Sequence, residues 1–393
     1  MKKILALALT ALAACSAAHA QNSVTIYGLL DLSVGASDTG EGTTLPGGTV
    51  RTANGFRNYR MDSGLMFGSR LGFRGVEDLG GGLRANFLLE MGINANTGTF
   101  NQGGLPWGRQ IYVGLGGSNW SLTAGRQYTP MNNSIAGSEP LAGGSWGNVT
   151  GEALAAFESI GAGAGSGGHQ MAARANNALQ LSASRAGLTG NLLVAAGDSN
   201  GRGTARFINP GVTYVAGPLR LDASYVRMRQ NAEQITATAV PEWLDQWMVG
   251  GSYDFGMAKL FAGAFRFSGP QNKANLSAAA TVGATGANSQ AFNWDTHELY
   301  WIGASIPLAG GAAKVQVARQ NFAYATGADG TATILGVAYD YPLSKRTLLY
   351  TSYGTVSNNG RSRTPLYGAI PLVGPNGFGS DPRALSVGVL HRF

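Results

Sequence analysis

Residues 23–34 read Ser-Val-Thr-Ile-Tyr-Gly-Leu-Leu-Asp-Leu-Ser-Val, an alternation of apolar and polar side chains with a period of two. Val24, Ile26, Leu30, Leu32 and Val34 fall on one side, and Thr25, Tyr27, Asp31 and Ser33 fall on the other. Successive side chains of a β-strand point to opposite faces of its sheet. The stretch therefore predicts a strand with one apolar face and one polar face.

The same alternation returns along the rest of the chain and, with the first stretch, makes sixteen predicted strands. The other fifteen are 65–77, 83–93, 109–116, 119–127, 175–185, 189–197, 207–216, 219–229, 244–254, 257–268, 294–306, 312–323, 332–341, 347–356 and 384–393. They average about ten residues, the length that a tilted strand needs to cross a bilayer. Strands of globular proteins are usually shorter, at about 5–6 residues.

The connections between these strands alternate in length. Short turns fall at 116–118, 216–218, 254–256 and 342–344, and long polar segments at 35–63, 94–107, 128–173, 269–293 and 357–382. Short turns at one end and long loops at the other are typical of an outer-membrane barrel, and an even strand number places both chain ends at the short-turn end. Lipid offers no partner to an unpaired strand edge, so the sheet must close. We predict an all-β fold, a transmembrane 16-stranded antiparallel barrel forming one domain over residues 21–393.

Composition supports a membrane β-protein. The 393 residues are 44% hydrophobic and only 12% charged, about half the charge density of a soluble domain. After the N-terminal segment no apolar run reaches the ~18 residues of a transmembrane helix, which excludes a helical bundle. The formal charge of +7 is scattered along the chain, so nucleic acid is not expected as a partner.

Residues 1–20 are typical of a signal peptide. Met1-Lys2-Lys3 is followed by an apolar stretch and then by Ala18-His19-Ala20, a signal peptidase site. Removing the two lysines lowers the formal charge from +7 to +5. The single cysteine, Cys15, lies within this segment, so the mature chain would hold no disulfide or thiolate site. An alternative is lipoprotein cleavage before Cys15, which would leave that residue lipidated.

Five stretches together resemble the general diffusion porins of Gram-negative bacteria. They are residues 23–28, 69–82, 108–115, 124–128 and the terminal 387–393, which ends on Phe393. The resemblance implies a homotrimer in the outer membrane, each barrel having its third external loop folded inward to narrow a pore for passive diffusion of small hydrophilic solutes and inorganic ions. In this family an aromatic residue at the end of the last strand is the signal for the barrel-insertion machinery, a role that Phe393 would take.

Alternation also orients the charged residues of the early strands. Leu71 and Phe73 would face the outer-membrane lipids, which turns Arg70 and Arg74 into the lumen. On the next strand the outward Leu83, Ala85, Phe87 and Leu89 leave Arg84, Asn86 and Glu90 inside. The opposite orientation would expose arginines to lipid at ~2–4 kcal/mol each near mid-depth. Arg174 is inward by the same parity.

The resemblance implies a ladder of arginines on the barrel wall facing acids on the inward loop. Its matching positions are Arg70, Arg126 and Arg174, with Arg74 beside them. Arg126 shares parity with outward Leu122 and Ala124, so it reaches the lumen only if the strand bulges or ends near Gly125.

The segment 128–173 is far longer than a hairpin needs and is the expected constriction loop. It carries Glu139, Glu152 and Glu158, and residues 151–158 have the composition of a short helix. We expect Glu152 and Glu158 to face the arginines, the alternative being solvated loop carboxylates. The excess of arginines predicts a weak preference for anions.

Other functions have weaker support in the sequence. A substrate-selective channel that binds a sugar, an acid or an aromatic solute remains open, as does a barrel adhesin. A barrel hydrolase would need an oriented base, and Asp295 with His297 is the one pair to consider. The glycine-rich segment 161–168 lacks the Gly-Lys-Ser/Thr of a phosphate loop, and His169, His297 and His391 lie far apart. We expect no catalytic residues, no cofactor and no metal.

Overall fold

The structure is a computed structural model that describes residues 23–43, 55–158, 173–196, 206–229, 243–268, 294–324 and 328–393. The predicted signal peptide, residues 1–20, lies outside the described residues, as do the glycine-rich segment 161–168 and His169. Within the described ranges, no helix has the length and apolar character required to cross a membrane.

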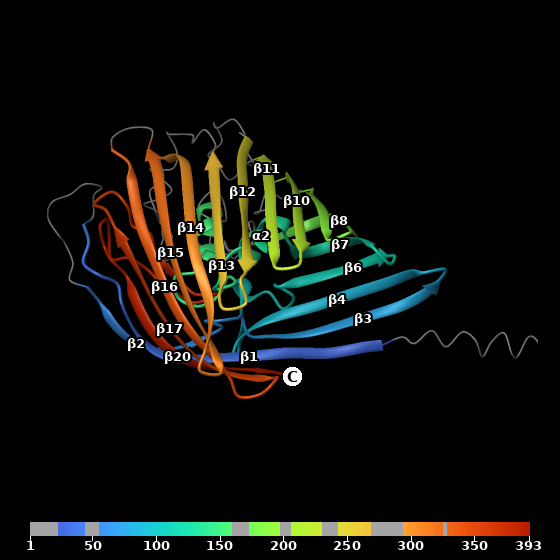
Figure 1. Ribbon diagram of the computed structural model, residues 1–393, viewed down its shortest axis with the longest axis horizontal. Helices are drawn as coiled ribbons and strands as arrows, with labels where there is room; N and C mark the ends of the chain where they lie inside the picture. Colours follow the sequence, from blue (N-terminus) through green and yellow to red (C-terminus); the bar gives the residue numbers. More distant parts are fainter. Residues whose placement is uncertain are drawn as a thin grey trace, which may run out of the picture.

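Strands make up most of the described chain (Figure 1). They are β1 (Ser23–Asp38), β2 (Arg57–Ser63), β3 (Arg70–Gly80), β4 (Leu83–Asn94), β5 (Thr99–Phe100), β6 (Gln110–Gly116), β7 (Trp120–Tyr128), β8 (Arg174–Arg185), β9 (Leu188–Ala195), β10 (Arg206–Ala216), β11 (Leu219–Arg229), β12 (Trp243–Asp254), β13 (Lys259–Ser268), β14 (Trp294–Leu308), β15 (Gly311–Tyr324), β16 (Gly330–Pro342), β17 (Thr347–Asn358), β18 (Leu366–Tyr367), β19 (Leu372–Val373) and β20 (Arg383–Arg392). The helical segments are η1 (Gln102–Gly104), α2 (Pro130–Gly137) and α3 (Val149–Glu158).

The sheet closes on itself between its first and last strands. β1 pairs with β20 through residues 29–38 and, on its other edge, with β3 through residues 23–29. The described sheet has 18 strands. Two of these occupy no position of their own, because β2 shares the edge of β1 with β3 and the two-residue β5 pairs only with β4. The other sixteen form a closed antiparallel barrel, as predicted.

The terminal residue completes this closure. The backbone of Phe393 exchanges two hydrogen bonds of 3.1 Å with Gly28, which extends the pairing of β20 with β1 by one residue pair. A Cβ atom at position 28 would lie 2.4 Å from the Phe393 ring. Glycine at this position therefore lets the terminal ring pack directly on the first strand.

One predicted strand is wrong in its boundaries. The alternation over 65–77 predicts one unbroken strand, but the wall consists of β2 and β3 separated by residues 64–69. The buried carboxylate of Asp31 accepts hydrogen bonds from the backbone nitrogens of Met66 (2.8 Å) and Phe67 (2.7 Å). These bonds replace strand pairing. The side chain of Leu65, which the alternation would direct toward lipid, is fully buried instead.

The outer face of the barrel is apolar, as the alternation predicts. On β1, the apolar side chains of Val24 and Ile26 are 65% and 62% exposed. The polar side chains of Asp31, Ser33 and Ser37, further along the same strand, are buried. Exposed apolar side chains continue around the wall, for example at Val113, Leu181, Ile302 and Val387. A continuous apolar surface of this kind is favourable in contact with lipid and unfavourable in contact with water.

The inner face is not uniformly polar, which the alternation did not predict. The loop ends of β11 to β15 direct large apolar side chains inward, among them Met228, Met248, Phe265, Leu299 and Phe322. These residues form one buried cluster with Met131, Ile135, Trp146, Val149 and Leu154, which belong to the segment between β7 and β8. Burying such a side chain contributes about 1.5–3 kcal/mol, so this cluster holds the segment inside the barrel.

Candidate functional site

The segment between β7 and β8 folds into the barrel, as Figure 1 shows for α2. Thr129 caps α2 by accepting a hydrogen bond from the Asn132 nitrogen, and Pro130 occupies the first turn, where its missing N–H is tolerated. After α2, the Ser138 hydroxyl donates to Asp222 on β11 at 3.0 Å, and its carbonyl accepts from the Trp301 indole on β14 at 2.8 Å. The loop is thus attached to the inner face of distant strands.

The loop then crosses to the strands that close the barrel. The indole of the fully buried Trp146 donates to the Ser386 hydroxyl on β20 at 3.0 Å, and its backbone nitrogen donates to Ser352 on β17 at 2.8 Å. At Gly144 the loop passes so close to residues 64–69 that a Cβ atom would lie 1.8 Å from the Met66 carbonyl oxygen.

Three segments far apart in the sequence meet inside the barrel. We call residues 64–69, 129–158 and 366–373 the inner shelf. Backbone hydrogen bonds join them: the Ser145 and Ala369 nitrogens donate to Leu65 at 2.8 and 3.0 Å, and the Gly147 nitrogen donates to Tyr367 at 2.9 Å. The inner shelf therefore includes part of the last external loop and the interruption of the second barrel strand, besides the predicted constriction loop.

A group of guanidinium side chains lies across from the inner shelf. Arg70 comes from β3, Arg109 from the residue before β6, and Arg174 from the start of β8. The Tyr128 hydroxyl accepts hydrogen bonds from Nη2 of Arg109 at 2.6 Å and from Nη2 of Arg174. The Arg174 guanidinium also lies 4.3 Å from the centre of the Tyr128 ring, within cation–π distance. We call Arg70, Arg109, Tyr128 and Arg174 the basic wall.

One buried carboxylate partly balances this charge. Glu90, only 3% exposed on β4, accepts a hydrogen bond from Nε of Arg109 at 2.8 Å and one from the Tyr27 hydroxyl at 2.9 Å. The oxygen that accepts from Tyr27, Oε2, also lies 3.8 Å from Nη1 of Arg70. The basic wall has three guanidinium groups. Counted together with the Glu90 carboxylate, it carries a formal charge of 3 − 1 = +2, and this is the charge given for the basic wall below.

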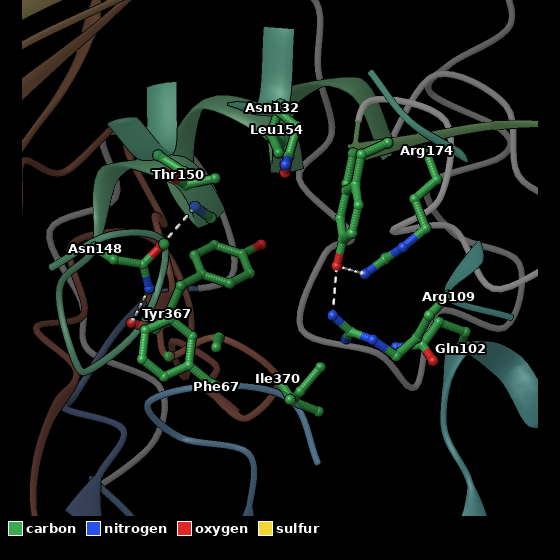
Figure 2. Close-up of a pocket in the computed structure, with 18 of the residues that line it drawn as sticks. Phe67, Gln102, Arg109, Asn132, Asn148, Thr150, Leu154, Arg174, Tyr367 and Ile370 are labelled. Atoms are coloured by element: carbon green, nitrogen blue, oxygen red, sulfur yellow. Dashed lines mark hydrogen bonds between the residues drawn. The ribbon is translucent and has the colours of Figure 1, made fainter. Parts of the chain in front are cut away.

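A cavity of about 310 Å³ separates the basic wall from the inner shelf. In Figure 2, Arg109 and Arg174 lie on one side of this cavity, and Phe67, Tyr367 and Asn148 lie on the other. The lining also includes several asparagine and glutamine side chains and the apolar Leu154 and Ile370. No carboxylate is among the described residues that line the cavity.

Comparison with known proteins agrees with this geometry. The family model described as Gram-negative porin matches residues 6–361. The chain belongs to the Gram-negative porin family. The porin is 31% identical over 385 residues to an outer membrane porin protein of Bordetella pertussis, with 91% of this chain and 95% of the relative covered. It is 30% identical over 399 residues to outer membrane porin protein 32 of Delftia acidovorans, with both chains covered completely.

Solved structures give the same fold. The anion-selective porin from Comamonas acidovorans matches with a TM-score of 0.71 and 25% identity, over 95% of this chain and 100% of that one. The trimer form of OmpT from Vibrio cholerae, at 12% identity, shares the fold with a TM-score of 0.62 over 95% of this chain and 99% of that one. With the family match, these comparisons make the protein an outer-membrane porin that forms a diffusion channel.

The predicted acids of the constriction loop do not line the cavity of the porin. The Glu139 carboxylate accepts hydrogen bonds from the backbone nitrogens of Gly143, Val149 and Thr150 at 2.9–3.0 Å. It also accepts one from Nε2 of Gln316 on β15 at 3.0 Å. These contacts turn the carboxylate away from the arginines and use it to brace the loop.

Glu152 also faces β15, where its carboxylate accepts a hydrogen bond of 3.4 Å from Nε2 of Gln320. Burial raises the pKa of Glu139, an effect that its hydrogen bonds partly oppose, and raises the pKa of Glu152 well above its ordinary range. The expectation that Glu152 faces the arginines is thus not met, and Glu139 of the same loop is also turned toward β15. Glu158 ends α3, and its side chain lies outside the described part of the chain.

Among the arginines predicted for the constriction of the porin, only Arg70 and Arg174 line the cavity. Arg74 lies four residues further along β3, toward the short-turn end, and its guanidinium is 5.2 Å from the centre of the Tyr27 ring. Arg84 is exposed beside a short turn, where it donates to the Gly117 carbonyl at 3.3 Å. Arg74 shares the strand parity of Arg70 on β3, and Arg84 shares that of Glu90 on β4.

Arg126 occupies a bulge, as its parity required. The pairing of β7 with β8 shifts register between Gly125 and Gln127, and Gly125 has a φ of +137°, a conformation that favours glycine. The buried guanidinium of Arg126 donates to the Gly108 carbonyl at 2.8 Å and to the Asn176 side chain. These bonds direct it into the wall, and it is absent from the cavity lining.

Sequence reasoning missed Arg109 and Tyr128. Ile111, Val113 and Leu115 are exposed on the outer face, so strict alternation would place Arg109 outside as well. The strand begins only at Gln110, however, and Arg109 is free of the pleat. An aromatic residue at the end of a strand gave no signal that would distinguish Tyr128 from an interfacial tyrosine.

The histidine of the hydrolase alternative is fully buried. His297 stacks on Phe322, with ring centres 4.7 Å apart, and meets the edge of Phe265 at 5.8 Å. A base enclosed by two aromatic rings has no access to a substrate in the lumen. The side chain of Asp295 lies outside the described residues. Within those residues, no group of three or more histidine, cysteine or acidic side chains forms a metal site.

Proposed function

We propose that this porin passes small anions in preference to cations, and that the basic wall selects them. One observation carries the proposal: three guanidinium groups line the cavity, and the described lining includes no carboxylate. A formal +2 in a passage of low effective dielectric attracts chloride and repels potassium. The name of the similar structure, the anion-selective porin from Comamonas acidovorans, supports this direction.

Each charged residue considered for the lumen has a proposed role. Arg70, Arg109 and Arg174 form the selective group, with Glu90 fixing the position of Arg109. Arg74 and Arg84, on the short-turn side, extend the positive potential along the exit path, while Arg126 braces the wall through Gly108. Glu139 and Glu152 secure the constriction loop against β15, and we assign Glu158 no opposing role.

Assembly follows the family pattern in this proposal. Residues 1–20 direct export, Phe393 serves as the signal for barrel insertion, and the mature barrel assembles as a homotrimer. The closing contact of Phe393 with Gly28 and the apolar faces of β1 and β20 support the last two points. Transport is passive and the porin catalyses no reaction.

The test is the zero-current potential of purified porin in a planar bilayer between two KCl concentrations. We expect a sign that reports chloride as the more permeant ion, and a magnitude that falls as both salt concentrations rise, because screening shortens the ~8 Å Debye length of physiological salt. A potential that reports potassium as more permeant would overturn the proposal.

A further inference from the structure

We propose that the cavity is a binding site for carboxylates that carry an aromatic or similarly apolar body. The carboxylate binds at Arg109, Tyr128 and Arg174, and the apolar body packs against Phe67 and Tyr367. This inference rests on the proposed anion preference and narrows it to a class of organic solute.

The Tyr128 hydroxyl is prepared to donate a hydrogen bond into the cavity. Its oxygen accepts from both Arg109 and Arg174, which occupies its two lone pairs. Its own proton is left to donate, and no acceptor for it is found among the described residues. An incoming carboxylate supplies that acceptor. The same carboxylate reaches N–H groups of the flanking guanidiniums, and such charge-assisted bonds are about twice as strong as neutral ones.

The opposite side of the cavity is apolar. Phe67 and Ile370 are partly exposed there, and Tyr367 and Leu154 also line it. They come from the three segments of the inner shelf, which backbone hydrogen bonds hold together. The surface is therefore already formed when a solute arrives, and little ordering is needed to use it. A bound chloride ion leaves this apolar surface in contact with water, whereas the aromatic ring of an organic carboxylate removes it from water.

The dimensions agree with a small solute. A volume of about 310 Å³ lies at the lower end of the ~300–1,000 Å³ of typical small-molecule sites. Figure 2 shows Phe67 and Tyr367 across the cavity from Arg109 and Arg174, so the two ends of one molecule can meet both surfaces. A benzoate-sized anion has this polarity, with charge at one end and an apolar ring at the other.

The experiment uses the intact porin in planar bilayers under symmetric KCl. Sodium benzoate, sodium acetate or benzyl alcohol is added to one side, and the reduction of the chloride current is measured. We expect benzoate to halve the current at a concentration at least tenfold below that of acetate, and benzyl alcohol to have no effect. Equal concentrations for benzoate and acetate would overturn the inference.

Three variants and one control locate the site. Phe67→Ala and, separately, Ile370→Ser should raise the benzoate concentration that halves the current to the value found for acetate. The KCl zero-current potential should be unchanged. Tyr128→Phe should weaken benzoate and acetate alike. Lys345→Gln, which removes an exposed charge in the turn after β16 and outside the cavity, is the control and should change the half-blocking concentration of neither solute. If benzoate still acts tenfold better in both apolar variants, the ring does not bind here.

The two proposals fail in distinguishable ways. An anion-favouring zero-current potential with no advantage of benzoate over acetate removes this inference and leaves the proposed function intact. A cation-favouring potential removes the proposed function, whatever benzoate does.

Discussion

The carboxylate of Glu139 lies 3.0 Å from the amide nitrogen of Gln316, on the far side of the ring of strands from the arginines. The acid that could have opposed the basic wall instead ties the constriction loop to β15. The lumen is consequently divided between a positive wall on one side and a neutral, partly apolar shelf on the other.

Removing this tie should loosen the loop without changing selectivity. Glu139→Ala deletes the acceptor of several hydrogen bonds, each worth on the order of 1.5–3 kcal/mol when one partner is charged. We expect a lower thermal unfolding temperature in detergent and larger fluctuations of the open current. The sign of the zero-current potential should stay as in the wild type. The control is Glu77→Gln, which changes an exposed acid near a short turn. If the open current of the Glu139→Ala channel fluctuates no more than that of this control, Glu139 does not brace the loop.

Glu152 should make the stability of the porin depend on pH. Its pKa is raised in the folded protein by burial, so the folded state holds this proton more tightly than the unfolded state does. Stability from this group is fully present below the ordinary pKa of glutamate and is lost as the pH rises toward the raised value. Glu152→Gln removes the dependence. Thermal unfolding should show the variant gaining on the wild type as the pH rises from 4 to 8, and equal differences at both ends would speak against a buried, protonated carboxyl.

Arg109 and Glu90 should behave as a coupled pair. Arg109→Gln alone leaves Glu90 without its closest cation, and breaking a buried pair costs about 3–5 kcal/mol. It also lowers the formal charge of the basic wall from +2 to +1. The double variant Arg109→Gln/Glu90→Gln restores 2 − 0 = +2 from Arg70 and Arg174. We expect the double variant to recover both the thermal stability and the zero-current potential, and recovery of neither would show that the two residues act independently.

The close passage at Gly144 offers a test of the inner shelf. A Cβ atom at this position meets the Met66 carbonyl at 1.8 Å, so Gly144→Ala must separate the loop from residues 64–69. Overpacking of this kind costs about 1–3 kcal/mol. We expect a wider, less steady channel with a higher single-channel conductance. Gly190→Ala is the control, because a Cβ there has no atom within 4 Å, and identical conductance in the two variants would mean that the shelf does not set the width.

Much of the barrel could be predicted from the sequence because lipid imposes a strict rule on its outer face. Side chains that face lipid, such as those of Val24, Ile26 and Val34, must be apolar. This rule fixes the number and orientation of the strands and the inward parity of Arg70 and Arg174. The rule ends where the chain leaves the wall. Asp31 looks like any polar lumenal residue, yet it draws residues 64–69 out of the sheet through two backbone nitrogens.

The contents of the lumen follow contacts between distant segments, which a single sequence does not reveal. Arg109 reaches the cavity because β6 starts one residue after it, and Glu139 turns to Gln316 because α3 offers its first backbone nitrogens at that point. The sequence shows which acids the constriction loop contains, but the direction of Glu139 and Glu152 depends on the apolar cluster that fixes the loop.

The central claim is that charge on the basic wall decides which ions pass. Arg70→Glu together with Arg174→Glu changes the formal charge there from +2 to −2, and the zero-current potential across a KCl gradient reads the result directly. The account predicts that the potential crosses zero and reports potassium as the more permeant ion, while Arg84→Glu shifts it only slightly. A potential that keeps the wild-type sign and size in the double variant would contradict it.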